Sequence, residues 1–323
     1  MSDDIRFYGF NFKLLYILPP YSSLGKNGYI SQNTTEEFNG TGSLELIFVD
    51  DELKKIVENN KDALFIVWRD FQGFITSYKW DTQCRITGMH LNGLLHRIVI
   101  PPVKYTAEES TTKSVCDIIT DNITANASWI FKGNVCSSSK VEYVTEKPLP
   151  ADEFITGVSK PNSIGFKVRA DVSGKNFYLD LKKSSENDLI LSEQNLNAYD
   201  FEQTYINKSK ASSGWYNKKD TGWTHITSTG DESNSYKSHI INNIVTVLSS
   251  TTKEDALQEL KSLVPEMEIV LKTRNVQHGI DYNIGDFVKV QKDGIMEKRL
   301  VGGVNMWNEG TYGEQPILEE TEM

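Results

Sequence analysis

The densest group of side chains that could perform chemistry lies in HGIDYNIGDFVKV, residues 278–290. His278, Asp281 and Asp286 stand within nine positions there, and these residue types can bind metals or transfer protons. Their spacing matches neither H-E-x-x-H nor the calcium-binding loop of EF-hands. We therefore predict a tight turn, with Gly285 at a positive φ and the Asp286 carboxylate accepting backbone hydrogen bonds. A hydrolase that uses Asp281 and Asp286 is the alternative.

The other candidate catalytic residues are scattered along the chain. They are four histidines and two acidic pairs: His90, His96, His225 and His239, and Asp50/Asp51 and Glu319/Glu320. Such acidic pairs are more typical of solvated surfaces and helix starts than of glycosidases. The sequence contains no G-x-S-x-G elbow, no G-x-x-x-x-G-K-[ST] loop and no G-x-G-x-x-G motif after a strand. We predict no catalytic residue, no cofactor and no metal site.

Cysteine and tryptophan residues leave two further possibilities open. The three cysteines are Cys84, Cys116 and Cys136, and their number and spacing fit neither a disulfide framework nor a zinc site. We expect buried free thiols. An exposed aromatic surface formed by Trp215, Tyr216 and Trp223 could bind carbohydrate, although packing in a core or interface is the more common role of such residues.

The composition describes an acidic globular protein. At 323 residues, with 38% hydrophobic and 24% charged side chains, the chain is long enough for two or three domains. A net charge of −10 argues against tight binding of nucleic acid, because that affinity comes mainly from Lys and Arg. The longest apolar runs, LLYIL and ALFIVW, are far shorter than the roughly 20 residues of a membrane span. We expect no stable membrane insertion and no secretory leader.

Hydrophobic periodicity predicts many strands and a few short helices. The expected strands lie in residues 5–18, 44–48, 63–70, 73–81, 164–172, 177–183, 198–209, 266–273 and 286–307. The expected helices follow Asp50, span 89–97, include 115–123 and span 252–264, the last with a capping box at Thr251 and Glu254. The predicted class is α+β, mostly antiparallel β, with small β-barrel or β-sandwich modules.

We divide the sequence into four modules. They are an N-terminal β-rich module (1–103), a helical and loop connection (104–163), a central β module with a long polar hairpin loop (164–250), and a helix with a closing β-hairpin (251–323). The polar segment 212–238 is expected to be a long hairpin or a mobile loop.

Three stretches, taken in order, resemble the tail-hub proteins of tailed bacteriophages, specifically the siphophage Gp37-like family, which is related in fold to contractile-tail baseplate hubs. The first runs from GTGSLELIFVDD to HRIVIPP and contains the pattern I-x-G-x-x-L-x-x-L-L-x-R at residues 86–97. The second is SGKNFYLDLKKSSENDLILSEQNLNAYDFEQTYINKS, and the third is HGIDYNIGDFVKVQKDGIMEKRLVGGVNMWNEGTYGEQPIL. Their shared order carries the resemblance more than any single motif does.

The resemblance implies a structural protein without enzymatic activity, located in the virion and assembled in the host cytoplasm. It implies a homotrimeric ring that joins the tail tube and distal tail protein to the tip or fibre proteins. The ring would surround the path of the tape-measure protein, which the resemblance implies as a further partner, and DNA would pass through its lumen without specific binding. Since many relatives carry a fibre or hydrolase after this region, we do not expect a lytic activity from residues 1–323. A carbohydrate-binding tip protein, or the hub of a contractile tail or tail-like particle, is the alternative.

Overall fold

The computed structural model describes residues 3–21, 27–60, 63–80, 83–107, 110–206, 213–218, 222–235, 245–262, 266–292 and 294–320. The chain forms two compact units, the first comprising residues 1–200 and 271–321 and the second comprising residues 201–270. The four modules predicted from the sequence are a division along sequence segments and stay a prediction.

The first unit contains an eleven-stranded sheet. Its strands, in spatial order, are β17 (Ser185–Ser192), β24 (Asp286–Lys292), β25 (Ile295–Asn308), β3 (Gly28–Glu37), β4 (Ser43–Val49), β7 (Cys84–His90), β6 (Phe71–Trp80), β5 (Leu64–Trp68), β1 (Ile5–Gly9) and β2 (Leu14–Leu18), and β26 (Tyr312–Glu320) also pairs with β25. The long strand β25 pairs with β24 through residues 295–300 and with β3 through residues 303–308. Nearly all neighbours are antiparallel, which confirms the predicted class, whereas β17 and β24 are parallel. Closed barrel or sandwich modules remain a prediction.

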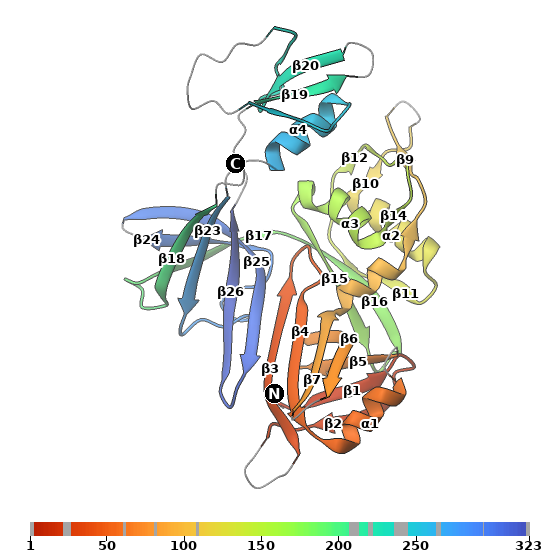
Figure 1. Cartoon of the computed structure of the whole chain (residues 1–323), viewed down its shortest axis with the longest axis vertical. Helices are drawn as coiled ribbons and strands as arrows, with labels where there is room; N and C mark the ends of the chain where they lie inside the picture. The colour runs from red at the N-terminus through yellow and green to blue at the C-terminus, as the bar shows by residue number, and fades with distance from the viewer. Residues whose placement is uncertain are drawn as a thin grey trace. The chain divides into compact units, whose positions relative to one another are not determined.

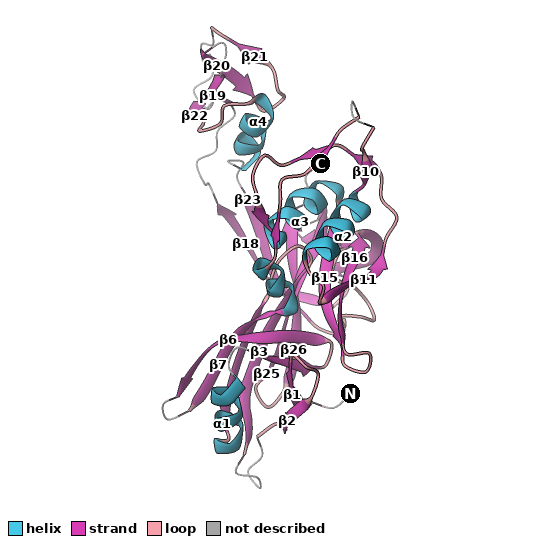
Figure 2. Ribbon diagram, turned by 90° about the vertical axis from the view of Figure 1, so that its right-hand side faces the viewer, coloured by secondary structure: helices cyan, strands magenta, loops and turns pink. Residues whose placement is uncertain are grey.

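A second, three-stranded sheet supports two helices in the same unit. It consists of β11 (Ile130–Val135), β16 (Asn176–Lys183) and β15 (Ile164–Asp171), and the helices are α2 (Val115–Asn126) and α3 (Ala151–Ser159). Figure 2 shows the two helices next to each other and close to these strands. The alternation predicted for residues 164–172 is confirmed, because Ile164, Phe166, Val168 and Ala170 are buried in the core beneath the helices. Helix α3 was not predicted from the sequence.

Two further helices are fixed by side chains at their N-termini. Asp50 caps α1 (Asp51–Asn60) as predicted, since its Oδ1 accepts hydrogen bonds from the amides of Glu52 (3.0 Å) and Leu53 (2.9 Å). The helix expected over 89–97 begins later, because β7 continues to His90 and a 3-10 helix, η1, spans Leu91–Arg97. The Nδ1 atom of His90 accepts a hydrogen bond from the amide of Asn92 (3.2 Å) and so caps η1.

Short elements connect the larger ones in the first unit. These are β8 (Val99–Ile100), β9 (Lys104–Tyr105), β10 (Lys113–Ser114), β12 (Lys140–Val141), β13 (Tyr143–Val144), β14 (Leu149–Pro150) and the 3-10 helix η2 (Lys160–Asn162). The six strands among them form three two-stranded sheets, in which β8 pairs with β14, β9 with β13, and β10 with β12.

The second unit includes most of two strands that pair with each other, β18 (Ala198–Ile206) and β23 (Glu266–Thr273). Its other elements are β19 (Ser213–Lys218), β20 (Gly222–Thr227), β21 (Glu232–Ser233), β22 (Val245–Val247) and α4 (Lys253–Ser262). Helix α4 packs on β19 and β20 (Figure 1). Part of the segment 212–238, predicted as a hairpin or mobile loop, is thus an antiparallel hairpin with a core of its own, formed by Tyr216, Ile226, Leu248, Ala256 and Leu260.

The cap of α4 lies one residue later than the sequence suggested. The amide of Asp255 donates to Thr252 Oγ1 (3.2 Å), and Thr252 Oγ1 donates to the Asp255 carboxylate (2.7 Å). The capping pair is therefore Thr252 and Asp255 instead of Thr251 and Glu254.

Among the described residues, no helix combines the length and the apolar composition needed to cross a bilayer.

Candidate functional site

The segment 278–286 has the geometry of a structural turn. Asp286 is almost fully buried, and its carboxylate accepts hydrogen bonds from Ser185 Oγ (2.8 Å), Asn187 Nδ2 (3.0 Å) and the amide of Asn283 (2.9 Å). Burial alone would raise the pKa of Asp286, but these hydrogen bonds and Lys182 outweigh it and lower the pKa. These hydrogen bonds attach the start of β17 to the turn.

His278 and Asp281 make separate contacts. Asp281 Oδ2 accepts a hydrogen bond from the amide of Gln277 (2.7 Å), and the amide of His278 donates to Glu314 Oε1 (2.5 Å). Within the described ranges, no group of three or more His, Cys, Asp or Glu side chains could hold a metal ion. The turn interpretation fits these contacts, while the absence of catalysis stays a prediction.

Gly285 shows why the turn needs glycine. Its φ is +89°, in the left-handed region, and a Cβ there would collide with the ring of Phe38. A Cβ on Gly165 in β15 would collide with the same ring. Phe38 is buried between the two glycines, so the turn is packed directly against the beginning of β15.

Replacing Asp286 by asparagine is expected to lower the free energy of unfolding by about 2 kcal/mol, because an amide cannot accept all of these hydrogen bonds. Chemical denaturation measures the loss. The same substitution at the exposed Asp188 is a matched control and should change stability by less than about 0.5 kcal/mol. Wild-type stability in Asp286→Asn, together with a lost hydrolytic activity, would support the hydrolase alternative instead.

The edge of β15 is joined to the large sheet by two side-chain amides. Asn92 Oδ1 accepts from the amide of Val168 (2.7 Å), and Asn92 Nδ2 donates to the carbonyls of Phe166 (3.2 Å) and Gly40 (2.8 Å). Asn92 is 1% exposed, so these bonds are shielded from water.

Gln72 repeats the arrangement one step further along β15. Its Oε1 accepts from the amide of Ala170 (2.6 Å), and its Nε2 donates to the carbonyl of the same residue (3.1 Å). The backbone amide of Phe166 donates to the carbonyl of Phe38 (3.0 Å). The edge of β15 that faces away from β16 is therefore largely satisfied without a further strand.

An ion pair with a buried carboxylate lies beside these amides. Lys167 Nζ is 2.6 Å from Glu36 Oε1, and the Glu36 side chain is only 7% exposed. Burial alone would raise the pKa of Glu36, but the charge and hydrogen bond of Lys167 more than compensate and lower it. Glu36 thus remains ionised at neutral pH.

His90 completes the group. It is fully buried, and burial lowers its pKa to about 4. The imidazole is therefore neutral at pH 7, which its Nδ1 requires in order to accept the hydrogen bond from the Asn92 amide. We call Glu36, Gln72, His90, Asn92 and Lys167 the polar seam. It fixes the three-stranded sheet to the large sheet within the first unit.

The polar seam was not predicted from the sequence. His90 and Asn92 lie inside the pattern at residues 86–97, but that pattern was defined by its apolar residues, glycine and arginine. The partners of Asn92 at residues 166 and 168 are more than seventy positions away. A polar residue next to the start of a buried 3-10 helix was the one available signal.

The aromatic residues of the second unit divide between two faces of the β19–β20 hairpin. Trp215 is opposite His225 and Asn217 is opposite Trp223, so both tryptophans lie on one face. Trp223 is 54% exposed. Tyr216 is on the other face, fully buried, with its hydroxyl bonded to Glu232, so it cannot belong to an exposed aromatic surface.

The remaining candidate catalytic residues that the structure describes form no common site. His96 Nδ1 contacts the Asp152 carboxylate at 3.2 Å, and burial lowers the pKa of His225. Burial raises the pKa of Glu319. His239 and the side chain of Glu320 lie outside the described residues.

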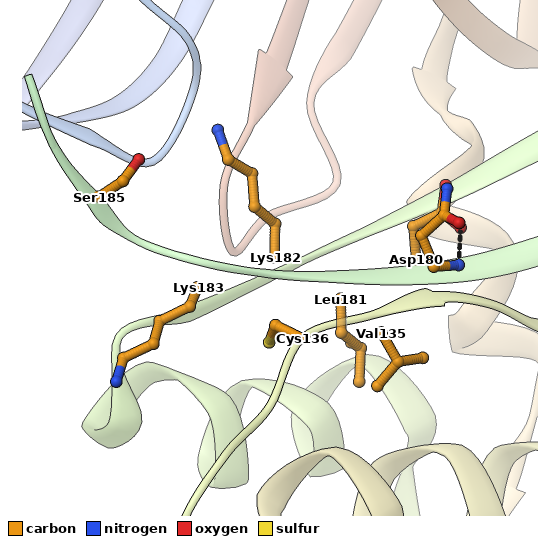
Figure 3. A pocket seen from close by; sticks show the side chains of 8 residues that line it. Val135, Cys136, Asp180, Leu181, Lys182, Lys183 and Ser185 are labelled. Atoms are coloured by element: carbon orange, nitrogen blue, oxygen red, sulfur yellow. Dashed lines mark hydrogen bonds between the residues drawn. The ribbon is translucent and has the colours of Figure 1, made fainter.

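A shallow hollow lies at the junction of β11 and β16 (Figure 3). The residues that line it are Asn134, Val135, Cys136, Asp180, Leu181, Lys182, Lys183 and Ser185. Asp180 Oδ1 accepts from the amide of Asn134 (2.7 Å), and Asp180 Oδ2 pairs with Arg169. Because both carboxylate oxygens of Asp180 already have partners, the hollow is a weak candidate for a catalytic site.

Comparisons with known proteins identify the fold. No family model matches the sequence, and no curated protein matches it. Among solved structures, the chain is similar to the 43 kDa tail protein of prophage MuSo2 from Shewanella oneidensis, with 13% identity, 99% of this chain and 97% of that chain covered, and a TM-score of 0.59.

Two other tail proteins give the same result. The prophage tail protein gp18 from Listeria monocytogenes has 12% identity and a TM-score of 0.55, and the match covers 99% of this chain and 95% of that chain. The tail protein from Neisseria meningitidis has 12% identity and a TM-score of 0.54, and the match covers 99% of this chain and 97% of that chain. The chain therefore has the fold of these tail proteins.

Proposed function

We propose that this protein is the structural hub of a phage tail tip or baseplate, of the Gp37-like type. It would form a homotrimeric ring that joins the tail tube and distal tail protein to the tip and surrounds the path of the tape-measure protein and DNA. The observation that carries the proposal is the tail-protein fold, which is shared along 99% of the chain. No catalytic step is part of this function.

Outer strands with exposed apolar side chains support assembly into a ring. β2 is the last strand at one end of the large sheet, and its Leu14 and Ile17 are 44% and 46% exposed. β11 is an outer strand of the three-stranded sheet, and its Phe131 is 46% exposed. Unpaired strand edges that carry apolar side chains favour pairing with strands of another subunit.

The acidic composition supports a conduit for DNA. With a net charge of −10, part of the negative charge would face the lumen and repel the phosphate backbone, so that DNA slides without binding. A ring whose lumen proved basic would overturn this part of the proposal.

The experiment that tests the hub function combines light scattering of the purified protein with imaging of the intact particle. We expect a mass of three chains in solution, or three copies around the tail axis in the particle. Light scattering alone does not decide, because trimer formation can require neighbouring tail proteins. One copy per tail tip, or absence from the particle, would refute the hub.

The shared face of Trp215 and Trp223 favours carbohydrate binding as a second candidate function. Replacing Trp223 by alanine is expected to weaken binding of soluble bacterial cell-wall polysaccharide at least about tenfold, because an aromatic platform contributes on the order of 1.5 kcal/mol. Isothermal titration calorimetry measures the affinity. Tyr216→Phe is the control, since it changes the buried face only. Equal affinities of wild type and Trp223→Ala would remove this candidate.

A further inference from the structure

Two of the three cysteines meet in the first unit although they are separated by 20 positions. Cys116 Sγ and Cys136 Sγ are 3.4 Å apart, and both are free thiols. A disulfide has an S–S length of about 2.05 Å, so the sulfur atoms need to approach by only about 1.4 Å. The sequence spacing gave no indication of this pair, because helix α2 and β11 fold the intervening residues back on themselves.

The backbone on both sides of the pair is held in register. The amide of Cys116 donates to Ser138 Oγ (3.0 Å), and the amide of Val115 donates to the carbonyl of Ser139 (3.1 Å). β10 and β12 pair directly beside these contacts. The amide of Cys136 donates to the carbonyl of Leu181 (3.1 Å), which ties the second cysteine to β16. These hydrogen bonds hold the backbone at both cysteines in place, with the two sulfur atoms 3.4 Å apart.

One thiol of the pair can be reached from solvent. Cys136 is partly exposed and lines the hollow between β11 and β16, where Lys182 and Lys183 also lie (Figure 3). Cys116 is 2% exposed and lies behind it. An oxidant thus meets Cys136 first, and Cys116 is placed to react second.

We propose that Cys116 and Cys136 form a disulfide when the folded protein meets a low-molecular-weight disulfide, and that this bond locks the start of α2 to the segment after β11. The Cys136 thiolate attacks one sulfur of oxidised glutathione, which gives a mixed disulfide and releases one glutathione. The Cys116 thiolate then attacks Cys136 Sγ and releases the second glutathione. Two protein thiols are oxidised and one glutathione disulfide is reduced. The inference does not depend on the proposed hub function.

The reaction should be slow near neutral pH and faster in alkali. Burial, and then the hydrogen bond with Cys116, raise the pKa of Cys136 to about 11. Because the thiolate is the attacking form, the rate should rise close to tenfold for each pH unit between pH 7 and pH 9.

The test uses the full chain, purified reduced, and incubated with oxidised glutathione. We expect alkylation to find one free thiol where the reduced protein has three, and digestion to give a peptide that joins Cys116 to Cys136. The oxidised protein should melt several degrees higher than the reduced protein, because the bond restricts the unfolded chain. A stable glutathione adduct on Cys136, or three free thiols after prolonged oxidation at pH 9, would overturn the proposal.

Variants separate the pair from the third cysteine. Cys84→Ser should still lose both remaining thiols, whereas the double variant Cys84→Ser, Cys116→Ser should accumulate the mixed disulfide on Cys136, and removing Cys84 is necessary because that thiol is also partly exposed. Cys136→Ser should not react through Cys116, since that thiol is buried. If Cys116→Ser does not fold, Cys116→Ala provides the same readout. An unchanged rate of thiol loss in both pair variants would contradict the proposed sequence of steps.

Discussion

Replacing Asn92 by leucine is expected to lower the free energy of unfolding of the first unit by about 4 kcal/mol. Leucine has nearly the same shape but leaves the buried amide of Val168 and the carbonyl of Phe166 without their partner from the polar seam. Each buried backbone group that loses its hydrogen bond costs about 1–3 kcal/mol. Chemical denaturation measures the loss.

The same substitution at Asn126 is the matched control. Asn126 is exposed at the end of α2 and donates to the carbonyl of Asn122 on its own helix (2.8 Å), so Asn126→Leu should change stability by less than about 1 kcal/mol. Equal effects of the two substitutions would mean that the polar seam does not hold the two sheets together.

Acid is expected to destabilise the first unit by about 2 kcal/mol between pH 7 and pH 5 through His90 alone. The folded-state pKa of His90 is about 4, below its ordinary value of 6.5. Between these values the unfolded chain binds a proton that the folded chain does not, so stability is lost as the pH falls below 6.5. Denaturation curves recorded across this range measure the effect.

His90→Asn separates this contribution from those of other groups. Asparagine keeps an oxygen that can accept the hydrogen bond from the Asn92 amide, but it does not titrate. The variant should therefore lose stability less steeply between pH 7 and pH 5. A residual slope is expected, because burial also lowers the pKa of His278. Identical slopes in wild type and His90→Asn would show that His90 is not the group that responds to acid.

Local features of the fold were predictable from the sequence. Period-two alternation identified the β15–β16 hairpin, and Asp50 was correctly predicted to cap α1. The hairpin over 286–307 is present as β24 and β25. In each case the side chains that decide the structure are neighbours in sequence, so the pattern carries the information.

Long-range features were not predictable. β17 lies parallel to β24, which is about a hundred residues further along the chain, and periodicity indicates which face of a strand is buried but not which strand lies beside it. The same limit applies to the polar seam and to the Cys116–Cys136 pair, whose members come from different elements. The alternative carbohydrate-binding surface included Tyr216, which is buried, because residue type alone does not reveal the inward face of a hairpin.

The passage of the chain into the second unit along β18 and back along β23 affects how readily that unit can be replaced. Because β18 and β23 are hydrogen-bonded neighbours and the boundary between the two units crosses both strands, the chain passes into the second unit and back along two paired strands, which lie roughly 5 Å apart. A foreign domain whose ends lie equally close could be spliced in without lengthening any connection. Residues 201–270 could therefore be replaced as one unit while the sheets of the first unit keep their connections.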